Sequence, residues 1–334
     1  MRGVLVREWM PFERLALHDL PMPEAGPREL LLRVKAAGMS FATSLVVQGK
    51  YQRKPPLPFT PGTEVAGEVV AVGAGANRFK PGDRVCAVLD WGGLAEFAIA
   101  KEVNTYGIPA AMPFEPAIAF TNSYATSAAA LTWAHLLHVT PGDFLLVHGA
   151  AGGVGLAACE IGRILGATVI ATAGSADKLA AARAHGADHV INYRETDFRE
   201  AVLALTNGRG VDKVYDPVGG EVFLQSLRCM APEGRIMPVG FAGGDIPNIP
   251  ANLLLVKNLT VCGLNLGFYY GWSPQDMRYE YEDRMRATLR QLFEWYEAGL
   301  IKPRVAAAYP LAQFQQAMSD VLGRRAIGRV AVVM

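Results

Sequence analysis

The residues best suited to do chemistry form a glycine-rich turn within Val147-His-Gly-Ala-Ala-Gly-Gly-Val-Gly-Leu156. An apolar run precedes the turn, and a helix-like stretch to about Leu165 follows it. Glycines at 149, 152 and 153 lack the Cβ atoms that would keep a pyrophosphate from the main chain, and Gly155 allows a helix to pack closely on a sheet. The unpaired N–H groups and the dipole at a helix start stabilise an anion. The turn therefore predicts a dinucleotide site.

The elements that would position this turn follow from the rhythm of the chain after Pro141. Short apolar runs alternate there with helical stretches, which is typical of a parallel sheet covered by helices on both faces. The turn Pro141-Gly-Asp143 opens this region. The strands are expected at Phe144–Val147, Thr168–Ala171, Val190–Asn192, Val211–Tyr215, Ile236–Val239 and Leu259–Cys262.

The first hundred residues have a different pattern, with short strands and turns that suggest an all-β, barrel-like unit. Strands are expected at Glu29–Val34, Gly67–Val72 and Val85–Leu89. Near the C-terminus, an amphipathic stretch over Met277–Ala298 ends at Gly299, which is typical of a helix stop. A second helix near Leu311–Leu322 and an edge-like strand at Val330–Val333 complete the expected α/β fold.

The end of the second expected strand selects the cofactor. NAD-binding folds usually carry an acid there, which bonds the adenosine ribose. This chain has Ala171-Thr-Ala-Gly-Ser175, without a carboxylate at the tip. Ser175, the Gly174 backbone and Lys178 could accept a 2′-phosphate, which favours NADP(H). The alternative is that Ser175 only caps the next helix and Lys178 is a solvated charge, with Asp177 opposing a phosphate.

Composition excludes several classes of protein. The 334 residues are 51% hydrophobic, which suits compact domains, and 32 Lys and Arg balance 31 Asp and Glu without a basic stripe for nucleic acid. The apolar run near Met1 is too short for a signal peptide, and longer apolar stretches are interrupted, so we expect a cytoplasmic protein without a membrane segment. His135 and His138 share an expected helix face without an acidic or Cys partner, so no metal site is predicted. The four cysteines, Cys86, Cys159, Cys229 and Cys262, are far apart and are expected to be reduced core thiols.

Several separated motifs give the chain a resemblance to a known family. They are Ala37-Gly-Met-Ser-Phe41, Pro61-Gly-Thr-Glu-Val-Ala-Gly67, Val70-Ala-Val-Gly73, Lys80-Pro-Gly-Asp-Arg-Val85, the turn at 148–155, Gly186-Ala-Asp-His-Val-Ile-Asn-Tyr193 and Val239-Gly-Phe241. The chain resembles the medium-chain dehydrogenase/reductase superfamily, in its zinc-independent NADPH:quinone oxidoreductase-like (zeta-crystallin-like) branch. The resemblance implies a GroES-like β-barrel catalytic domain at 1–123, completed by 266–334, and a Rossmann NADP-binding domain, a doubly wound parallel sheet, at 124–265. It also implies an active site in the cleft.

The same resemblance assigns the cofactor contacts. Thr126 matches a position at which the superfamily places a hydroxyl near the nicotinamide, although a buried helix Thr bonded to its own backbone is the alternative. Phe241 would lie beside the nicotinamide. Gly149, Gly152, Gly153, Val154 and Gly155 would contact the pyrophosphate, and Gly174, Ser175, Lys178 and Tyr193 the adenosine phosphate.

The substrate side departs from the zinc enzymes of the superfamily. Their zinc-binding Cys and His correspond here to Met39 or Ser40 and to Thr63, which are not soft or imidazole ligands. The resemblance therefore implies direct hydride transfer to a quinone or to an alkene conjugated to a carbonyl. Tyr51 matches a cleft tyrosine of the family that could bond the acceptor oxygen or supply a proton, and packing is its alternative role. The catalytic candidates are Tyr51, Ser40 and Thr63.

Two features leave the substrate open. Quinone oxidoreductases usually show Asn-Phe-x-Asp where this chain has Ser40-Phe-Ala-Thr43, so quinone preference does not follow directly. Phe41, Trp91, Phe268-Tyr-Tyr270 and Trp272 could wall an apolar pocket for a flat or acyl substrate, or could belong to the core.

Alternative functions are a zinc-dependent alcohol dehydrogenase-like enzyme and a non-catalytic NADPH-binding protein. For partners, we expect small quinone, enone or enoyl molecules, with no nucleic acid and no membrane. We also expect a homodimer joined near Leu259–Leu264, because the family commonly pairs the edge strands of its nucleotide domains.

Overall fold

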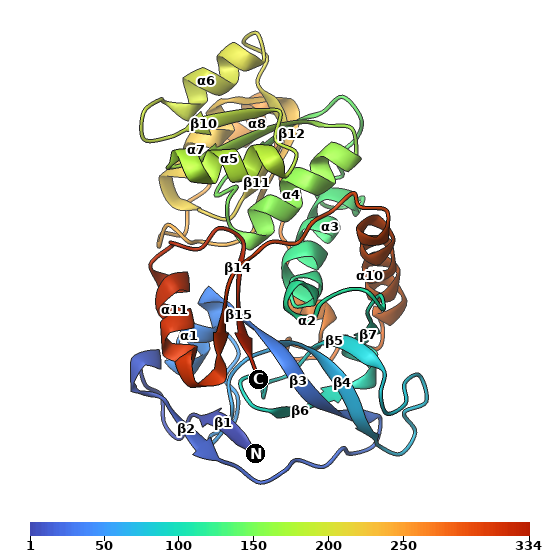
Figure 1. Ribbon diagram of the computed structural model, residues 1–334. Coiled ribbons are helices and arrows are strands. Elements are labelled where there is room, and N and C mark those ends of the chain that lie inside the picture. The colour runs from blue at the N-terminus through green and yellow to red at the C-terminus, as the bar shows by residue number, and fades with distance from the viewer. The chain divides into compact units, whose positions relative to one another are not determined.

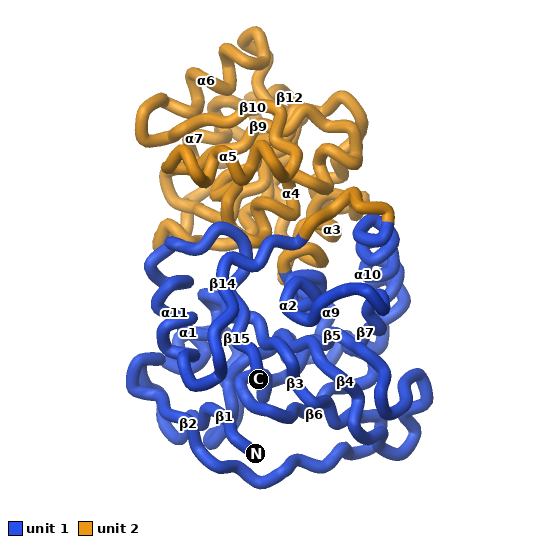
Figure 2. The backbone as a smooth tube through the Cα atoms, viewed as in Figure 1, with its two compact units in different colours: residues 1–122, 266–297, 303–334 blue, residues 123–265, 298–302 orange.

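A computed structural model describes residues 1–334 and divides into two compact units. Unit 1 consists of residues 1–122, 266–297 and 303–334, and unit 2 of residues 123–265 and 298–302 (Figure 2).

Unit 2 is built on a six-stranded sheet in which all neighbouring strands are parallel (Figure 1). Its strand order is β10-β9-β8-β11-β12-β13. The predicted parallel sheet is thus confirmed. The strands are β8 (Phe144–Val147), β9 (Thr168–Ala173), β10 (His189–Asn192), β11 (Val211–Asp216), β12 (Met230–Pro238) and β13 (Thr260–Val261).

Helices connect these strands, and the path of the chain through the sheet decides which face each helix covers. From β8 the chain adds β9 and then β10 on one side, and it then returns to add β11, β12 and β13 on the other side of β8. Because crossovers between parallel strands are right-handed, this reversal places the two sets of helices on opposite faces of the sheet. The reversal also makes the gap between the ends of β8 and β11 the switch point, where such sheets bind ligands. The helices are α3 (Ala125–Thr132), α4 (Gly153–Ile164), α5 (Ala176–Ala184), α6 (Phe198–Leu205), α7 (Gly220–Arg228) and α8 (Ala251–Lys257).

Unit 1 is mainly antiparallel β-structure. Its seven-stranded sheet has the order β14-β15-β3-β4-β5-β7, and β6 also pairs with β3. Val-rich and Leu-rich strand positions that point inward form its core with residues such as Leu32, Val65 and Met318. The strands are β3 (Glu29–Met39), β4 (Glu64–Val72), β5 (Arg84–Val88), β6 (Phe97–Lys101), β7 (Thr105–Gly107), β14 (Val305–Pro310) and β15 (Arg329–Val333), beside the hairpin of β1 (Arg2–Leu5) and β2 (Ala16–Asp19).

Helices of four to sixteen residues complete unit 1 around this sheet. A π-helical turn at Phe120–Tyr124 leads out of unit 1 and into α3 of unit 2. No helix of the chain is both long enough and apolar enough to cross a membrane. The unit 1 helices are α1 (Phe41–Val47), α2 (Phe114–Ala117), α9 (Leu266–Tyr269), α10 (Glu282–Glu297) and α11 (Phe314–Leu322), with 3-10 turns at Phe12–Arg14, Glu102–Asn104 and Leu311–Gln313.

Three sequence expectations about local structure are wrong. Strand β15 is not an edge, because β14 pairs with it in parallel and β3 covers its other side. His135 and His138 share no helix face, since α3 ends at Thr132 and His138 has a φ of 49°. Helix α10 begins at Glu282, five residues after the expected start of the amphipathic stretch at Met277.

Candidate active site

The glycine-rich turn follows β8 directly and runs into α4. Gly149 has a φ of +54°, which L side chains rarely adopt. A Cβ on Gly155 would lie 2.5 Å from the carbonyl oxygen of Gly149 and 2.7 Å from the Cα of Ala150. Gly152 is the N-cap and supplies no side-chain cap, so the first N–H groups of the twelve-residue α4 have no side-chain acceptor. The turn is therefore compact, and its donors are available to an anion.

His148, the first residue after β8, anchors the start of this turn through two side-chain hydrogen bonds. Its Nδ1 lies 2.9 Å from Thr172 Oγ1 and its Nε2 lies 2.8 Å from Ser226 Oγ. Because the Ser226 hydroxyl donates to the Val222 carbonyl at 2.7 Å, it accepts from His148, which must carry its proton on Nε2. Complete burial lowers the pKa of His148 to about 3. The residue is thus a neutral structural bridge between β8, β9 and α7.

Asp216 shapes the neighbouring turn at the end of β11. The side chain is buried, and its Oδ1 accepts hydrogen bonds from the N–H groups of Val218 at 2.7 Å and Gly219 at 3.2 Å. Burial raises the pKa of Asp216, while these two bonds act in the opposite direction. The carboxyl group holds the turn that faces the glycine-rich turn across the switch point of the sheet.

The end of β9 brings a tyrosine and an arginine beside a glycine. A Cβ on Gly174 would lie 2.7 Å from the Tyr193 hydroxyl oxygen and 3.1 Å from Arg194 Nε. Both side chains reach this position because β10 pairs with β9 in parallel and Asn192 lies opposite Ala173. Arg194 is exposed, and no acidic side chain pairs with its guanidinium. Sequence reasoning missed Arg194, although it follows the recognised Tyr193 directly.

Ser175 and Asp177 interact at the start of α5. Ser175 is the N-cap of α5, but its side chain makes no capping bond. Its hydroxyl instead donates to the Asp177 carboxylate, which lowers the pKa of Asp177. Ser175 therefore occupies the N-cap position that the alternative interpretation gave it, but without a side-chain capping bond. The Asp177 charge lies beside the predicted phosphate-binding residues, as the sequence indicated.

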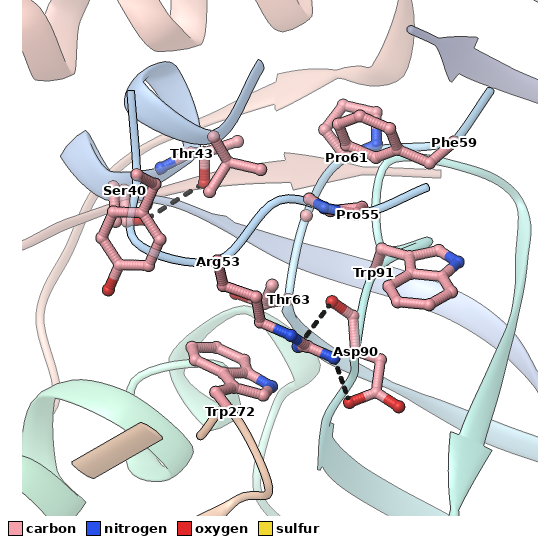
Figure 3. A pocket seen from close by; sticks show the side chains of 14 residues that line it. Ser40, Thr43, Arg53, Pro55, Phe59, Pro61, Thr63, Asp90, Trp91 and Trp272 are labelled. Atoms are coloured by element: carbon pink, nitrogen blue, oxygen red, sulfur yellow. Dashed lines mark hydrogen bonds and ion pairs between the residues drawn. The ribbon is translucent and has the colours of Figure 1, made fainter. Parts of the chain in front are cut away.

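Unit 1 contains a hollow, called here the unit 1 pocket (Figure 3). The three catalytic candidates, Ser40, Tyr51 and Thr63, all line it. The pocket forms between the start of α1, the loop that follows α1, the segment before β4, the end of β5 and the segment after α9. Most of its surface is apolar. Its remaining lining residues are Ala42, Thr43, Val46, Arg53, Pro55, Phe59, Pro61, Gly62, Asp90, Trp91 and Trp272.

The three candidates differ in what they can do. Ser40 is the N-cap of α1, where its Oγ accepts from the Thr43 N–H at 3.4 Å and lies 3.1 Å from the Thr43 hydroxyl. Burial raises the pKa of Tyr51, so this phenol stays protonated at neutral pH and can donate a hydrogen bond. Thr63 lines the pocket beside them. Ser40 thus caps α1, and the Tyr51 hydroxyl, which interacts with the Gln52 side chain, can still donate its O–H to a ligand.

Arg53 and Asp90 are the charged groups of the unit 1 pocket. Arg53 donates through Nη2 to Asp90 Oδ1 at 3.0 Å and through Nη1 to the Asp90 carbonyl at 3.2 Å (Figure 3). Its guanidinium carbon lies 5.6 Å from the ring centres of both Trp91 and Trp272. Arg278, which is only 3% exposed, also donates to Asp90 Oδ1, at 3.0 Å. Sequence reasoning predicted the two tryptophans but neither Arg53 nor Asp90.

The other predicted aromatic and cofactor residues are distributed as follows. Trp91 and Trp272 line the unit 1 pocket, whereas Phe41 is exposed and Tyr270 is buried with its hydroxyl donating to the Thr121 carbonyl at 2.8 Å. In unit 2, Thr126 is buried in α3. Phe241 follows β12, and its ring lies against Gly219. A Cβ on Gly219 would be 2.8 Å from Phe241 Cδ1.

The thiols and possible metal ligands are dispersed. All four cysteines are free and buried, and burial raises the pKa of Cys229 to about 12. No three His, Cys, Asp or Glu side chains of the chain come together as a metal site would require.

Comparison with known proteins gives two matching family models. The model described as alcohol dehydrogenase GroES-like domain matches residues 26–110. The model described as zinc-binding dehydrogenase matches residues 153–284. The first match lies in unit 1, and the second covers most of the parallel sheet of unit 2 and continues into unit 1.

Individual relatives match almost the whole chain. Quinone oxidoreductase-like protein 2 from Rattus norvegicus is 37% identical over 95% of this chain and 88% of its own. Quinone oxidoreductase from Rattus norvegicus is 32% identical over 96% and 94%. The crystal structure of Escherichia coli quinone oxidoreductase complexed with NADPH superimposes with a TM-score of 0.89 at 29% identity, covering 100% of each chain.

The fold and these matches define a class, an oxidoreductase with a GroES-like domain and a Rossmann parallel sheet. The chain belongs to the medium-chain dehydrogenase/reductase superfamily, in its zinc-independent, quinone oxidoreductase-like branch. The predicted family and fold class are thereby confirmed.

Proposed function

We propose that this protein uses NADPH to reduce a quinone or an alkene conjugated to a carbonyl, without zinc. The observation that carries the proposal is the glycine-lined turn at the end of β8, in which Gly155 leaves room for the Gly149 carbonyl. The related Escherichia coli quinone oxidoreductase was solved with NADPH, which supports the same cofactor here.

The residues of unit 2 suit a dinucleotide. The pyrophosphate would be held by Gly149, Gly152, Gly153, Val154 and Gly155, because a Cβ at Gly155 would collide with the turn and the first N–H groups of α4 have no side-chain cap. Thr126 and Phe241 would bind the nicotinamide end. Bound NADPH would supply a hydride, which no amino-acid side chain can donate.

The adenosine 2′-phosphate would be bound at the end of β9. Gly174, Ser175, Lys178 and Tyr193 are the predicted contacts, and we add Arg194 because its Nε lies beside Gly174 without an acidic partner. A guanidinium binds a phosphate through two parallel hydrogen bonds, which no neutral ribose hydroxyl can match. The nearby Asp177 would oppose the phosphate, and its hydrogen bond with Ser175 partly satisfies the carboxylate.

The unit 1 pocket would bind the acceptor. Its apolar walls and aromatic rings suit a flat conjugated molecule. The Tyr51 hydroxyl would donate to the acceptor oxygen, which gains negative charge as the acceptor is reduced, and would supply the proton directly or through water. Thr63 and Ser40 would orient the acceptor through their hydroxyl groups.

The assembly and location of the protein are also proposals. Strand β13 ends the sheet of unit 2, and the adjoining α8 exposes Leu255 and Val256. A second copy adding its own β13 would cover this edge and make a homodimer. Sedimentation as a 35.9 kDa species at micromolar concentration would contradict the dimer. We further propose a cytoplasmic protein, with a catalytic domain at 1–123 and 266–334 and an NADP-binding domain at 124–265.

The proposed reaction can be tested directly with purified, metal-stripped protein. NADPH absorbance at a fixed protein concentration should fall faster when a quinone, an enone or an enoyl thioester is added. Tight NADPH binding without turnover of any acceptor would contradict the reaction and favour a non-catalytic binding protein. Recovery of activity only with added zinc would contradict the metal-free reaction.

A further inference from the structure

We propose that the acceptor carries an anionic oxygen group, such as a carboxylate, and that Arg53 binds this group inside the unit 1 pocket. This inference rests on the proposed function, since it names the class of acceptor. It would direct the enzyme toward conjugated carbonyl compounds that bear a carboxylate and away from neutral quinones.

Arg53 has unused hydrogen-bonding capacity. A guanidinium has five N–H donors, and Arg53 uses two of them, both toward Asp90. The indoles of Trp91 and Trp272 lie near its faces and therefore do not consume N–H groups. Three N–H donors of Arg53 remain without a protein partner. The indole N–H of Trp272, in the same pocket wall, is also buried without a partner.

Arg53 has one acidic partner, Asp90, whose Oδ1 also accepts from the buried Arg278. Because Arg278 pairs in turn with Asp276, the four side chains balance in charge, and Arg53 offers a ligand its unpaired N–H groups. No other charged side chain lines the unit 1 pocket. The adjoining loop adds Lys50 and Lys54, and neither is paired with a carboxylate. Within these mostly apolar walls, Arg53 is the one cationic side chain.

These features favour an anion over a neutral acceptor. A neutral apolar molecule that filled the pocket would remove water from the free N–H groups of Arg53 and leave them unpaired, which is costly. A carboxylate would replace that water with short, charge-assisted hydrogen bonds, and the planar guanidinium matches its geometry. The two indoles and Asp90 hold the guanidinium in place, so little conformational freedom is lost on binding.

The test compares two acceptors that differ in one charge, 3-benzoylacrylate and its methyl ester. Both contain the same conjugated ketone and phenyl ring. In the presence of NADPH, the carboxylate should have a kcat/KM about tenfold or more above that of the ester, which is the usual scale of a charge-assisted hydrogen bond. Equal values for the two compounds would overturn the proposal.

Variants identify the residue responsible. Arg53→Gln should reduce the ratio of kcat/KM for the carboxylate to that for the ester to about one, whatever happens to turnover of either compound alone, whereas Arg53→Lys should keep part of the preference because it retains the charge. Arg33→Gln is the matched control, since Arg33 also lies over an aromatic ring, 5.5 Å from the centre of Phe97, but outside the pocket. A preference that survives in Arg53→Gln would show that Arg53 only braces the loop against Asp90.

A second readout separates this inference from the reaction itself. Titration of the protein with 3-benzoylacrylate without NADPH should quench tryptophan fluorescence, because Trp91 and Trp272 border Arg53. Quenching that requires Arg53, together with no turnover, would keep the anion site and reject the proposed reaction. Turnover of both compounds without Arg53-dependent binding would keep the reaction and reject the anion site.

Discussion

The hydrogen of Gly155 points at the carbonyl oxygen of Gly149, and a Cβ in its place would lie 2.5 Å from that oxygen. The two residues hold the first turn of α4 against the end of β8. A Cβ on Gly155 would also lie 2.7 Å from the Cα of Ala150, so the surrounding backbone leaves no space for it on this side.

Gly155→Val should therefore displace the glycine-rich turn and weaken NADPH binding by about tenfold or more, since forcing added atoms into a closely packed site costs on the order of 1–3 kcal/mol. Calorimetric titration with NADPH measures the change. Gly107→Ala is the control, because a Cβ there meets only Phe79, at 3.9 Å. Unchanged affinity in Gly155→Val would contradict a phosphate site at this turn.

Acid should destabilise the protein through His148. Its pKa is lowered to about 3 in the folded chain, below the ordinary 6.5, so the unfolded chain binds a proton that the folded chain does not between these values. The stability contribution is complete above about pH 6.5 and is lost as the pH falls, by at most about 1.4 kcal/mol per pH unit. The free energy of unfolding, measured with urea at several values between pH 7 and pH 5, should fall less steeply with decreasing pH for His148→Gln than for the natural protein. An equal pH dependence of the unfolding free energy in the two proteins would mean that His148 is protonated in the folded state.

Arg194→Gln should weaken NADPH binding by about tenfold and leave NADH binding unchanged, because only the 2′-phosphate needs the guanidinium. The neighbouring Arg199→Gln removes the same charge from α6 and serves as the control. Dissociation constants for both cofactors measure the selectivity. An equal loss for the two cofactors would indicate a general disturbance at Gly174 instead of phosphate recognition.

Tyr51→Phe should lower kcat/KM by about 10²-fold, the usual scale for a side chain that takes part in proton transfer, with little change in NADPH affinity. Since burial raises the pKa of Tyr51, any loss of activity from phenol ionisation should have its midpoint above the ordinary tyrosine pKa of 10.0. Tyr309→Phe is the control, because it removes the hydroxyl that donates to Asp320 outside the unit 1 pocket. Full activity in Tyr51→Phe would leave Tyr51 with a packing role.

Local patterns in the sequence predicted the parts of the fold that depend on neighbouring residues. Three short segments could be interpreted without knowing their distant contacts. They are the glycine-rich turn at 148–155, the apolar run of β8 and the acid-free end of β9. The predicted strand at Phe144–Val147 has the observed bounds of β8. Strand pairing was harder to predict. The β14 segment, Val305-Ala-Ala-Ala-Tyr-Pro310, shows no alternation of apolar and polar residues, and it is defined as a strand by its pairing with β15.

The unit 1 pocket needed the tertiary structure. Arg53 and Asp90 are 37 residues apart, and Arg278 is 188 residues from Asp90, so no sequence spacing predicts that two guanidiniums share one carboxylate oxygen. Arg194 likewise comes beside Gly174 only because β10 pairs in register with β9. The sequence by itself determined the family, the parallel sheet and the glycine-rich turn, because backbone preferences and apolar periodicity are local. Only the folded chain decided which charges meet in the pocket, since electrostatic contacts depend on distance in space.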